Sequence, residues 1–235
     1  MDWAPTFAGL EIAPGPLYYN GTSFEIKDNW NYDSYDSVYG KTAGSTYFNF
    51  IEMGQLFEKA DFSESDGNIE NLLDPLDGWR LPTQTEWAAI TTNTTAREGS
   101  TVNGRAGQHY AMIELTGVMH AGSSYPAGLL IFPDGKTITG LILGEMDNET
   151  LNTDVTESEL NAYLSQGCVF LPASGHWSNG TYYEGGHIGY YWTSNELSSY
   201  TGESYFLQSV SMYGYVELII LSGRKDLYNS VRLVK

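Results

Sequence analysis

Few side chains in this sequence are suited to covalent chemistry, and its one cysteine is not placed as a nucleophile. Cys168 lies between Gly167 and the apolar run Val169-Phe170-Leu171. A lone cysteine in an apolar strand is usually a small core residue, and no adjacent base or positive charge would activate its thiol. We therefore expect Cys168 to be buried and unreactive. A single cysteine also excludes an internal disulfide.

The four histidines, His109, His120, His176 and His187, show none of the spacings that zinc sites use. His176 and His187 could meet in space, but their spacing predicts no metal site. The sequence also lacks a G-x-S-x-G elbow, a phosphate-binding loop and a dinucleotide fingerprint. We therefore predict a protein that is not an enzyme, has no catalytic residues and uses no cofactor.

The formal net charge is −18, from 29 acidic and 11 basic residues. Phosphate backbones and anionic membrane surfaces would be repelled, so neither nucleic acid nor a membrane is an expected partner. The carboxylates would suit a cation such as Ca²⁺, although no spacing predicts a structural calcium site. No apolar run approaches the ~18 residues of a membrane span, and the N-terminal residues lack the basic and apolar regions of a signal peptide.

The elements that would position a site begin with two capped helices. Thr83 and Glu86 have the T-x-x-E spacing of a capping box, in which each side chain accepts from the other residue's backbone N–H. Thr156 and Glu159 repeat this spacing, which predicts a short helix over 156–164.

A further helix is expected over 45–59, followed by an acidic surface loop over 60–77. Four apolar residues would form one side of this helix: Phe48, Ile51, Leu56 and Phe57.

Strand-like runs alternate with turns over 109–143, where Pro133-Asp134-Gly135 has the residues of a tight turn. Further strands are predicted over 168–174 and 230–234, and 204–221 is predicted to form two strands around Tyr213-Gly214.

The combination of these elements predicts an α+β fold in a single domain over 1–235. Residues 1–45 are rich in Gly, Pro and Tyr, and we interpret them as an N-terminal extension of short strands and turns.

The segment 175–195, GHWSNGTYYEGGHIGYYWTSN, holds six aromatic residues and five glycines with almost no aliphatic residue. Tyrosine gives a large contact area at low entropic cost, and glycine lets a loop fit its backbone to a partner. In the strand over 215–220, the alternation would place Tyr215, Glu217 and Ile219 on the face opposite Val216, Leu218 and Ile220. That face is either an ordinary surface or part of a binding surface.

Four ordered segments resemble the bacterial C-type-lectin-like domains, which include the formylglycine-generating-enzyme-like and Fibrobacter succinogenes major paralogous domain groups. They are GWRLPTQTEW (78–87), FLPASGHWSNGT (170–181), GYYWTSN (189–195) and SVRLV (230–234). The resemblance covers roughly 45–235 and implies a C-type-lectin-like fold with short strands, two or three helices and long irregular loops. The formylglycine-generating enzymes use paired cysteines and copper, so their activity is not implied for a chain with one cysteine.

The C-terminal part is most similar to the variable proteins of diversity-generating retroelements, which display a lectin-fold surface on phage tails or bacterial surfaces. The resemblance implies a variable ligand-binding region over 168–235. Eight fixed core positions would be Tyr191, Trp192, Tyr205, Leu207, Val216, Leu218, Val231 and Arg232. The candidate ligand-binding residues are Trp177, Tyr182, Tyr183, His187, Tyr190, Phe206, Tyr213, Tyr215, Glu217, Ile219, Asp226 and Tyr228.

The expected function is therefore binding of a protein or glycan receptor, by a protein that is extracellular or displayed on a cell surface or virion. Two alternatives stay open. One is an enzyme on the formylglycine-generating-enzyme-like scaffold, which rests on analogy of fold. The other is a structural subunit of a surface appendage. The sequence does not predict an oligomeric state.

Overall fold

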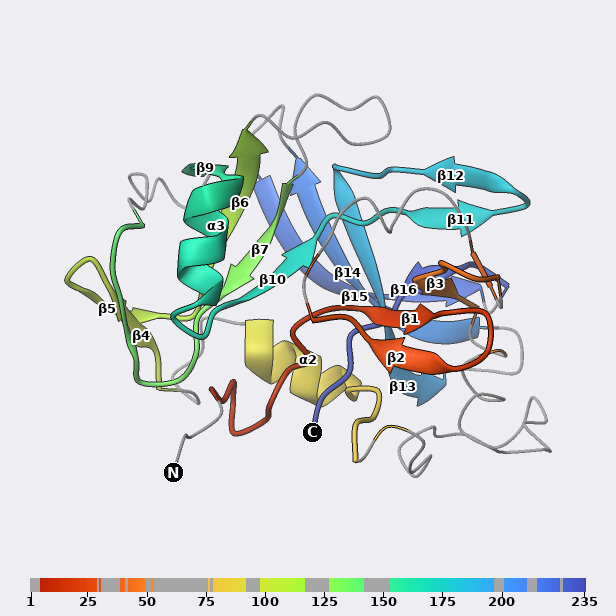
Figure 1. Ribbon diagram of the computed structural model, residues 1–235, viewed down its shortest axis with the longest axis horizontal. Coiled ribbons are helices and arrows are strands. Elements are labelled where there is room, and N and C mark those ends of the chain that lie inside the picture. The colour runs from red at the N-terminus through yellow and green to blue at the C-terminus, as the bar shows by residue number, and fades with distance from the viewer. Residues whose placement is uncertain are drawn as a thin grey trace.

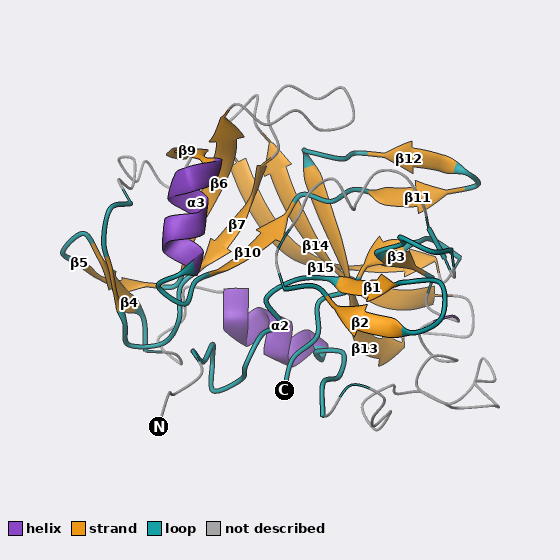
Figure 2. Cartoon of the chain, viewed as in Figure 1, coloured by secondary structure: helices purple, strands orange, loops and turns teal. Residues whose placement is uncertain are grey.

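The computed structural model describes residues 5–28, 30, 39–40, 42–49, 52, 76, 78–91, 98–116, 127–141, 153–196, 201–210, 215–224 and 226–235. Among these residues, sixteen strands are found but only two helices of eight residues each. Figure 2 shows strands across the molecule and two short helices. The structure is thus a mostly-β fold, and the prediction of an α+β fold class is wrong.

The error arises partly from the segment 45–59. Tyr47–Phe48 form strand β3, which pairs antiparallel with Asn229–Ser230, strand β16. Phe48 is fully buried as a strand residue and not as part of an apolar helix side. The other three apolar positions of the predicted helix, and most of the predicted loop over 60–77, lie outside the described residues.

Both capping boxes predicted from the sequence are confirmed. Helix α2 spans Gln84–Thr91, and the Glu86 N–H donates to Thr83 Oγ1 at 3.1 Å while the Thr83 N–H donates to Glu86 Oε2 at 2.8 Å. Helix α3 spans Glu157–Leu164 with Thr156 as its N-cap and Glu159 completing the box. In each helix the capping box satisfies backbone N–H groups of the first turn, and the buried residues lie on one side of the helix.

A four-stranded sheet of order β10-β7-β6-β9 contributes to a different core cluster on each of its faces. Its strands are Val169–Pro172, Ala127–Ile131, Tyr110–Thr116 and Thr153–Thr156 respectively. Leu160 and Tyr163 of α3 belong to the core on one face, and Trp87 and Ile90 of α2 belong to the core on the other. Figure 1 shows α3 lying across this sheet and α2 below it. Cys168 is buried at the start of β10, as expected.

A five-stranded sheet of order β15-β14-β13-β16-β3 combines the last four strands of the chain with β3 from its N-terminal half. Its three long strands are β13, Ile188–Glu196, β14, Thr201–Val210, and β15, Tyr215–Arg224. The strand pair predicted around Tyr213-Gly214 is therefore confirmed. The strand predicted over 230–234 is wrong beyond Ser230, because β16 spans Asn229–Ser230. Tyr191 and Trp192 are consecutive in β13 and enter two different core clusters, because successive side chains leave a strand on opposite sides.

The N-terminal segment is joined to the C-terminal end of the chain. Ile12 forms a bridge with Val234, and the backbone groups of Glu11 and Lys235 exchange two hydrogen bonds of 3.0 Å. Strands β1, Leu17–Tyr19, and β2, Phe24–Ile26, follow as a hairpin. Phe7 is fully buried in the α2 core cluster. The described part of the predicted extension thus packs within the cores of the rest of the molecule.

Strands β4, Ser100–Val102, β5, Arg105–Gln108, and β8, Thr137–Ile138, form a small sheet at the far end from the β11–β12 hairpin (Figure 1). Gly135 has a φ of 62°, in keeping with the predicted turn before β8. No helix among the described residues is long and apolar enough to cross a membrane.

Candidate binding surface

The aromatic segment forms a hairpin that projects from one end of the molecule (Figure 1). Strand β11, His176–Ser178, pairs antiparallel with β12, Thr181–Tyr183. Asn179 and Gly180 connect the strands with φ angles of 49° and 77°. Two central residues with positive φ define the type I′ turn, which matches the twist of the flanking strands and favours Asn-Gly.

The register divides the aromatic residues between the two sides of the hairpin. Trp177 is opposite Tyr182, and the neighbouring pair is His176 opposite Tyr183. Successive cross-strand pairs lie on opposite sides of a two-stranded ribbon. We call the side of Trp177 and Tyr182 the inner side, because both residues contact the body of the protein.

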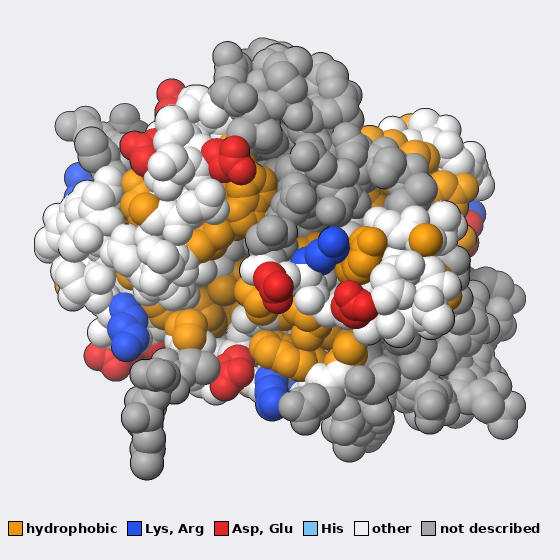
Figure 3. Space-filling model, viewed as in Figure 1, with side chains coloured by type: hydrophobic (Ala, Val, Ile, Leu, Met, Phe, Trp, Pro, Cys, Tyr) orange, Lys and Arg blue, Asp and Glu red, His pale blue; other side chains and the backbone are white. Residues whose placement is uncertain are grey.

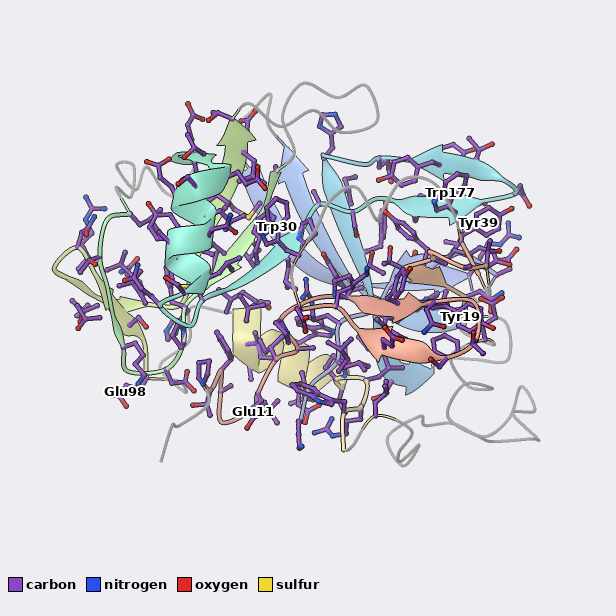
Figure 4. All side chains as sticks on the ribbon, in the orientation of Figure 1. Glu11, Tyr19, Trp30, Tyr39, Glu98 and Trp177 are labelled. Carbon is purple, nitrogen blue, oxygen red and sulfur yellow. The ribbon has the colours of Figure 1, made fainter. Side chains whose placement is uncertain are left out.

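On the inner side, Trp177 and Tyr182 are half-buried against aromatic residues from distant parts of the chain. The Trp177 ring lies 4.9 Å from the Tyr39 ring, which lies 4.6 Å from the Tyr228 ring. Figure 4 shows Trp177 and Tyr39 side by side. The Tyr182 ring lies 6.0 Å from the buried Tyr47. These contacts make the inner side a packing surface within the protein.

Hydrogen bonds hold the inner side in place. The hydroxyls of Tyr47 and Tyr182 both donate to the Ser174 carbonyl oxygen, at 2.5 and 2.7 Å. The backbones of Trp177 and Tyr228 exchange two hydrogen bonds of 3.0 Å. A Cβ at Gly185 would overlap the Tyr182 ring, so glycine is needed there for this close approach. The hairpin is thereby fixed by its inner side.

The opposite side of the hairpin carries a second aromatic group. The His176 ring stacks on the Tyr183 ring, with centroids 5.4 Å apart, and meets the Tyr190 ring edge-on at 4.7 Å. The Tyr190 hydroxyl donates to Glu184 Oε2, which lies 3.6 Å from His176 Nδ1. Tyr183 is 44% exposed. We call His176, Tyr183, Glu184 and Tyr190 the outer aromatic face.

The outer aromatic face is uncharged apart from its carboxylate at neutral pH. Burial lowers the pKa of His176, and the Glu184 charge only partly opposes this effect, so the imidazole is neutral. Burial raises the pKa of Tyr190, and the hydrogen bond and charge of Glu184 raise it further. The face therefore offers aromatic rings beside one anion, and the Tyr190 phenol stays protonated.

Four of the candidate residues lie on β14 and β15, where the structure defines their register. Tyr190 of β13 is opposite Phe206, and Phe206 is opposite Ile219. Glu217 and Tyr215 follow at alternate positions of β15, opposite Gln208 and Val210. The candidate positions therefore continue across the sheet in register with the outer aromatic face. Tyr213 lies outside the described residues.

The remaining candidate residues, His187 and Asp226, are exposed. His187 follows the Glu184-Gly185-Gly186 turn. Burial and the charge of Asp154 raise the pKa of Glu114, and His187 partly opposes this rise. Asp226 accepts hydrogen bonds from Arg224 at 2.9 and 2.5 Å. Both side chains are open to solvent.

Fixed positions implied by the resemblance are buried wherever their side chains are described. Tyr191, Trp192, Val231 and Arg232 are all fully buried. The Arg232 guanidinium donates to the carbonyl oxygens of Ala13 at 3.1 Å and Phe170 at 2.8 Å. Arg232 thus joins the N-terminal segment to β10, which explains a buried arginine in this position. Tyr205, Leu207, Val216 and Leu218 alternate with the candidate residues in the register of β14 and β15.

Sequence reasoning missed three residues of this region. Glu184 and His176 complete the outer aromatic face, and Tyr39 supports the inner side. The Asn179-Gly180 dipeptide was a usable signal, since a hairpin there pairs His176 with Tyr183. No local pattern could have revealed Tyr39, because it contacts Trp177 from a segment far away in the sequence.

Among the described residues, no three His, Cys, Asp or Glu side chains cluster as a metal site would require. Burial raises the pKa of the Cys168 thiol to about 12, so it is protonated at neutral pH. Comparison of the chain with family models, curated proteins and solved structures found no match. The geometry of the hairpin is therefore the main guide to function.

Proposed function

We propose that this protein is a non-enzymatic binding protein that recognises a protein or glycan receptor through the outer aromatic face. The observation that carries the proposal is the group formed by His176 and Tyr183 of the projecting hairpin with Tyr190 of β13, around the Glu184 carboxylate. Its rings are held in position by contacts on the other side of the hairpin. A preorganised surface loses little conformational entropy when it binds.

The chemistry of this surface suits a partner with both apolar and polar groups. Tyr183 presents an exposed ring that can stack on a sugar or on an apolar side chain, and its hydroxyl can donate or accept. The Glu184 carboxylate is 44% exposed and accepts from sugar hydroxyls or protein donors. We place the protein outside the cell, on a cell surface or on a virion, where receptors of both kinds occur.

The resemblance to retroelement-diversified proteins adds a second level to this proposal. The buried residues Tyr191, Trp192, Val231 and Arg232 would be fixed, while exposed positions such as Tyr183, His187 and Asp226 would vary between copies. Such a division keeps the fold while the binding surface changes. A nearby reverse-transcriptase gene and a near-copy of the 3′ end differing at adenines would establish it, and their absence would contradict it.

Substitution on the two sides of the hairpin tests the binding proposal. Tyr183→Ala should weaken binding at least about tenfold in a glycan array or cell-binding assay, with no change in thermal unfolding. Trp177→Ala should instead lower the unfolding temperature, because its ring packs inside the protein. Tyr18→Ala, on the β1–β2 hairpin, removes a tyrosine ring away from the outer aromatic face and is the control, which should leave binding unchanged.

Two results would contradict the proposal. If Tyr183→Ala unfolded the protein, the ring would be part of the core. If Tyr183→Ala bound each receptor with the same affinity as the unsubstituted protein, the outer aromatic face would not be the binding surface.

A further inference from the structure

A hollow lies away from the hairpin, between α3, the N-terminal segment and the end of β2. It encloses about 480 Å³. Its apolar walls are Ile12, Pro14, Trp79, Leu164 and Val169. Figure 3 shows hydrophobic surface between the regions of α3 and the β1–β2 hairpin, with both acidic and basic side chains beside it. Volumes of this size hold small molecules.

The charged groups of this cavity all have the same sign. Glu11 and Asp28 are among its lining residues, and no Lys, Arg or His is. Within the described part of the chain, neither carboxylate is in an ion pair. Of the neighbouring cations, Lys27 places its Nζ over the Tyr18 ring at 3.8 Å. Two carboxylates beside an apolar wall attract a ligand that is both cationic and apolar.

Two further features fit the same ligand. The backbone of Glu11 is held by two hydrogen bonds to Lys235, which fixes the point from which its side chain extends. Trp79 adds an indole to the wall, and indole is the aromatic group that attracts cations most strongly. The Cys168 thiol is protonated, since burial raises its pKa to about 12, and so contributes neither charge nor nucleophile.

We propose that this cavity binds a small organic cation, with its ammonium group beside Glu11 and Asp28 and its hydrocarbon body on Ile12, Trp79 and Leu164. The site is separate from the outer aromatic face and does not depend on the function proposed for that face. The ligand class that we propose for the cavity is amines and quaternary ammonium compounds that carry an apolar chain or ring.

Calorimetric titration with hexyltrimethylammonium tests the proposal, with hexanol and hexanoate as neutral and anionic probes of similar length. A cation with about ten non-hydrogen atoms should bind with a Kd on the order of 0.1–1 mM. Hexanol should bind at least about fivefold more weakly and hexanoate should not bind, because the carboxylates repel it. Raising the salt concentration should weaken binding of the cation alone.

Charge-neutralising variants locate the site. Glu11→Gln and Asp28→Asn should each weaken cation binding about threefold to tenfold while leaving hexanol binding unchanged. Glu98→Gln, at the opposite end of Figure 4 from the hairpin, removes the same charge away from the cavity and is the control. Leu164→Ala should weaken both the cation and hexanol. Circular dichroism would verify the fold of each variant.

The proposal is overturned if hexyltrimethylammonium binds no better than hexanol. It is also overturned if Glu11→Gln and Asp28→Asn, both folded, behave like Glu98→Gln. Because Glu11 and Asp28 lie on different segments, failure of one variant to fold leaves the other as the test.

Discussion

At the scale of single residues, neighbours in the hairpin have different roles. The resemblance grouped Trp177, Tyr182 and Tyr183 together as candidate ligand-binding residues. The register separates them, since Trp177 and Tyr182 pack on Tyr39 and Tyr47 while Tyr183 stacks on His176. An aromatic-rich polar sequence cannot by itself distinguish these roles, because aromatic residues lie on both sides of the hairpin. The distinction comes from partners elsewhere in the chain.

His176 gives a prediction about pH. Burial lowers the pKa of His176, so the folded state binds a proton less readily than the unfolded state. In the unfolded state a histidine has a pKa of about 6.5. The stability associated with neutral His176 is therefore present above this value and is lost as the pH falls through it toward the lower folded pKa. His176→Phe keeps an aromatic ring and removes the titration.

Urea unfolding at several pH values between 7.5 and 5 measures this effect. The unsubstituted protein should lose more stability on acidification than His176→Phe does. The other histidines are present in both proteins, so their contributions cancel in the difference between the two free energies of unfolding. Tyr183→Ala keeps His176 and should retain the acid sensitivity. Parallel pH profiles for the unsubstituted protein and His176→Phe would contradict the prediction.

At the scale of elements, local signals succeeded where the stabilising partner is also local. The capping boxes at Thr83 and Thr156 predicted the starts of both described helices, because each box closes within four residues. The strand at Phe48 was predicted as helix, since its apolar spacing suits either structure. Its pairing with Asn229 decides the outcome, and that partner is far along the chain.

Thr156 gives a prediction for α3. Its Oγ1 accepts from the Glu159 N–H, and its own N–H donates to Glu159 Oε2 at 2.8 Å. Thr156→Ala should lower the free energy of unfolding by about 1 kcal/mol, the usual effect of removing an N-cap. Thr156→Ser keeps the hydroxyl and should stay within about 0.5 kcal/mol of the parent. Equal destabilisation by both substitutions, in urea unfolding, would show that the methyl group rather than the cap matters.

At the scale of the whole molecule, the ends of the chain form part of the core. Ile12 bridges Val234, and Arg232 donates to the Ala13 carbonyl oxygen. The Leu17 N–H donates to the Val231 carbonyl oxygen at 3.0 Å, and the Leu17 side chain belongs to the same core cluster as Val231 and Trp192. Sequence reasoning treated 1–45 as an extension because no motif covered it. The residues of 1–45 that enter the core could not be identified from the sequence, because the strands on which they pack lie elsewhere in the chain. The same limit applies to the fold class, which depends on how many short strands find partners.

Phe7 therefore gives a prediction about cooperativity. Its ring is fully buried in the cluster that contains Trp87 of α2 and Tyr191 of β13. Phe7→Ala should lower the free energy of unfolding by about 3–5 kcal/mol, the range for removing a buried aromatic ring. Tyr18→Ala, on a half-buried residue of the same N-terminal region, should cost far less.

The decisive measurement is urea unfolding followed both by tryptophan fluorescence and by far-ultraviolet circular dichroism. If the N-terminal segment belongs to one cooperative unit, the two curves of Phe7→Ala should shift together and stay coincident. If the N-terminal segment were instead packed on an independently stable domain, Phe7→Ala would cause the segment to unfold in a separate, earlier transition. The unfolding transition of the rest of the protein would then be unchanged. That result would restore the interpretation of 1–45 as an extension, whereas a joint shift makes its packing a condition for the fold that positions the hairpin.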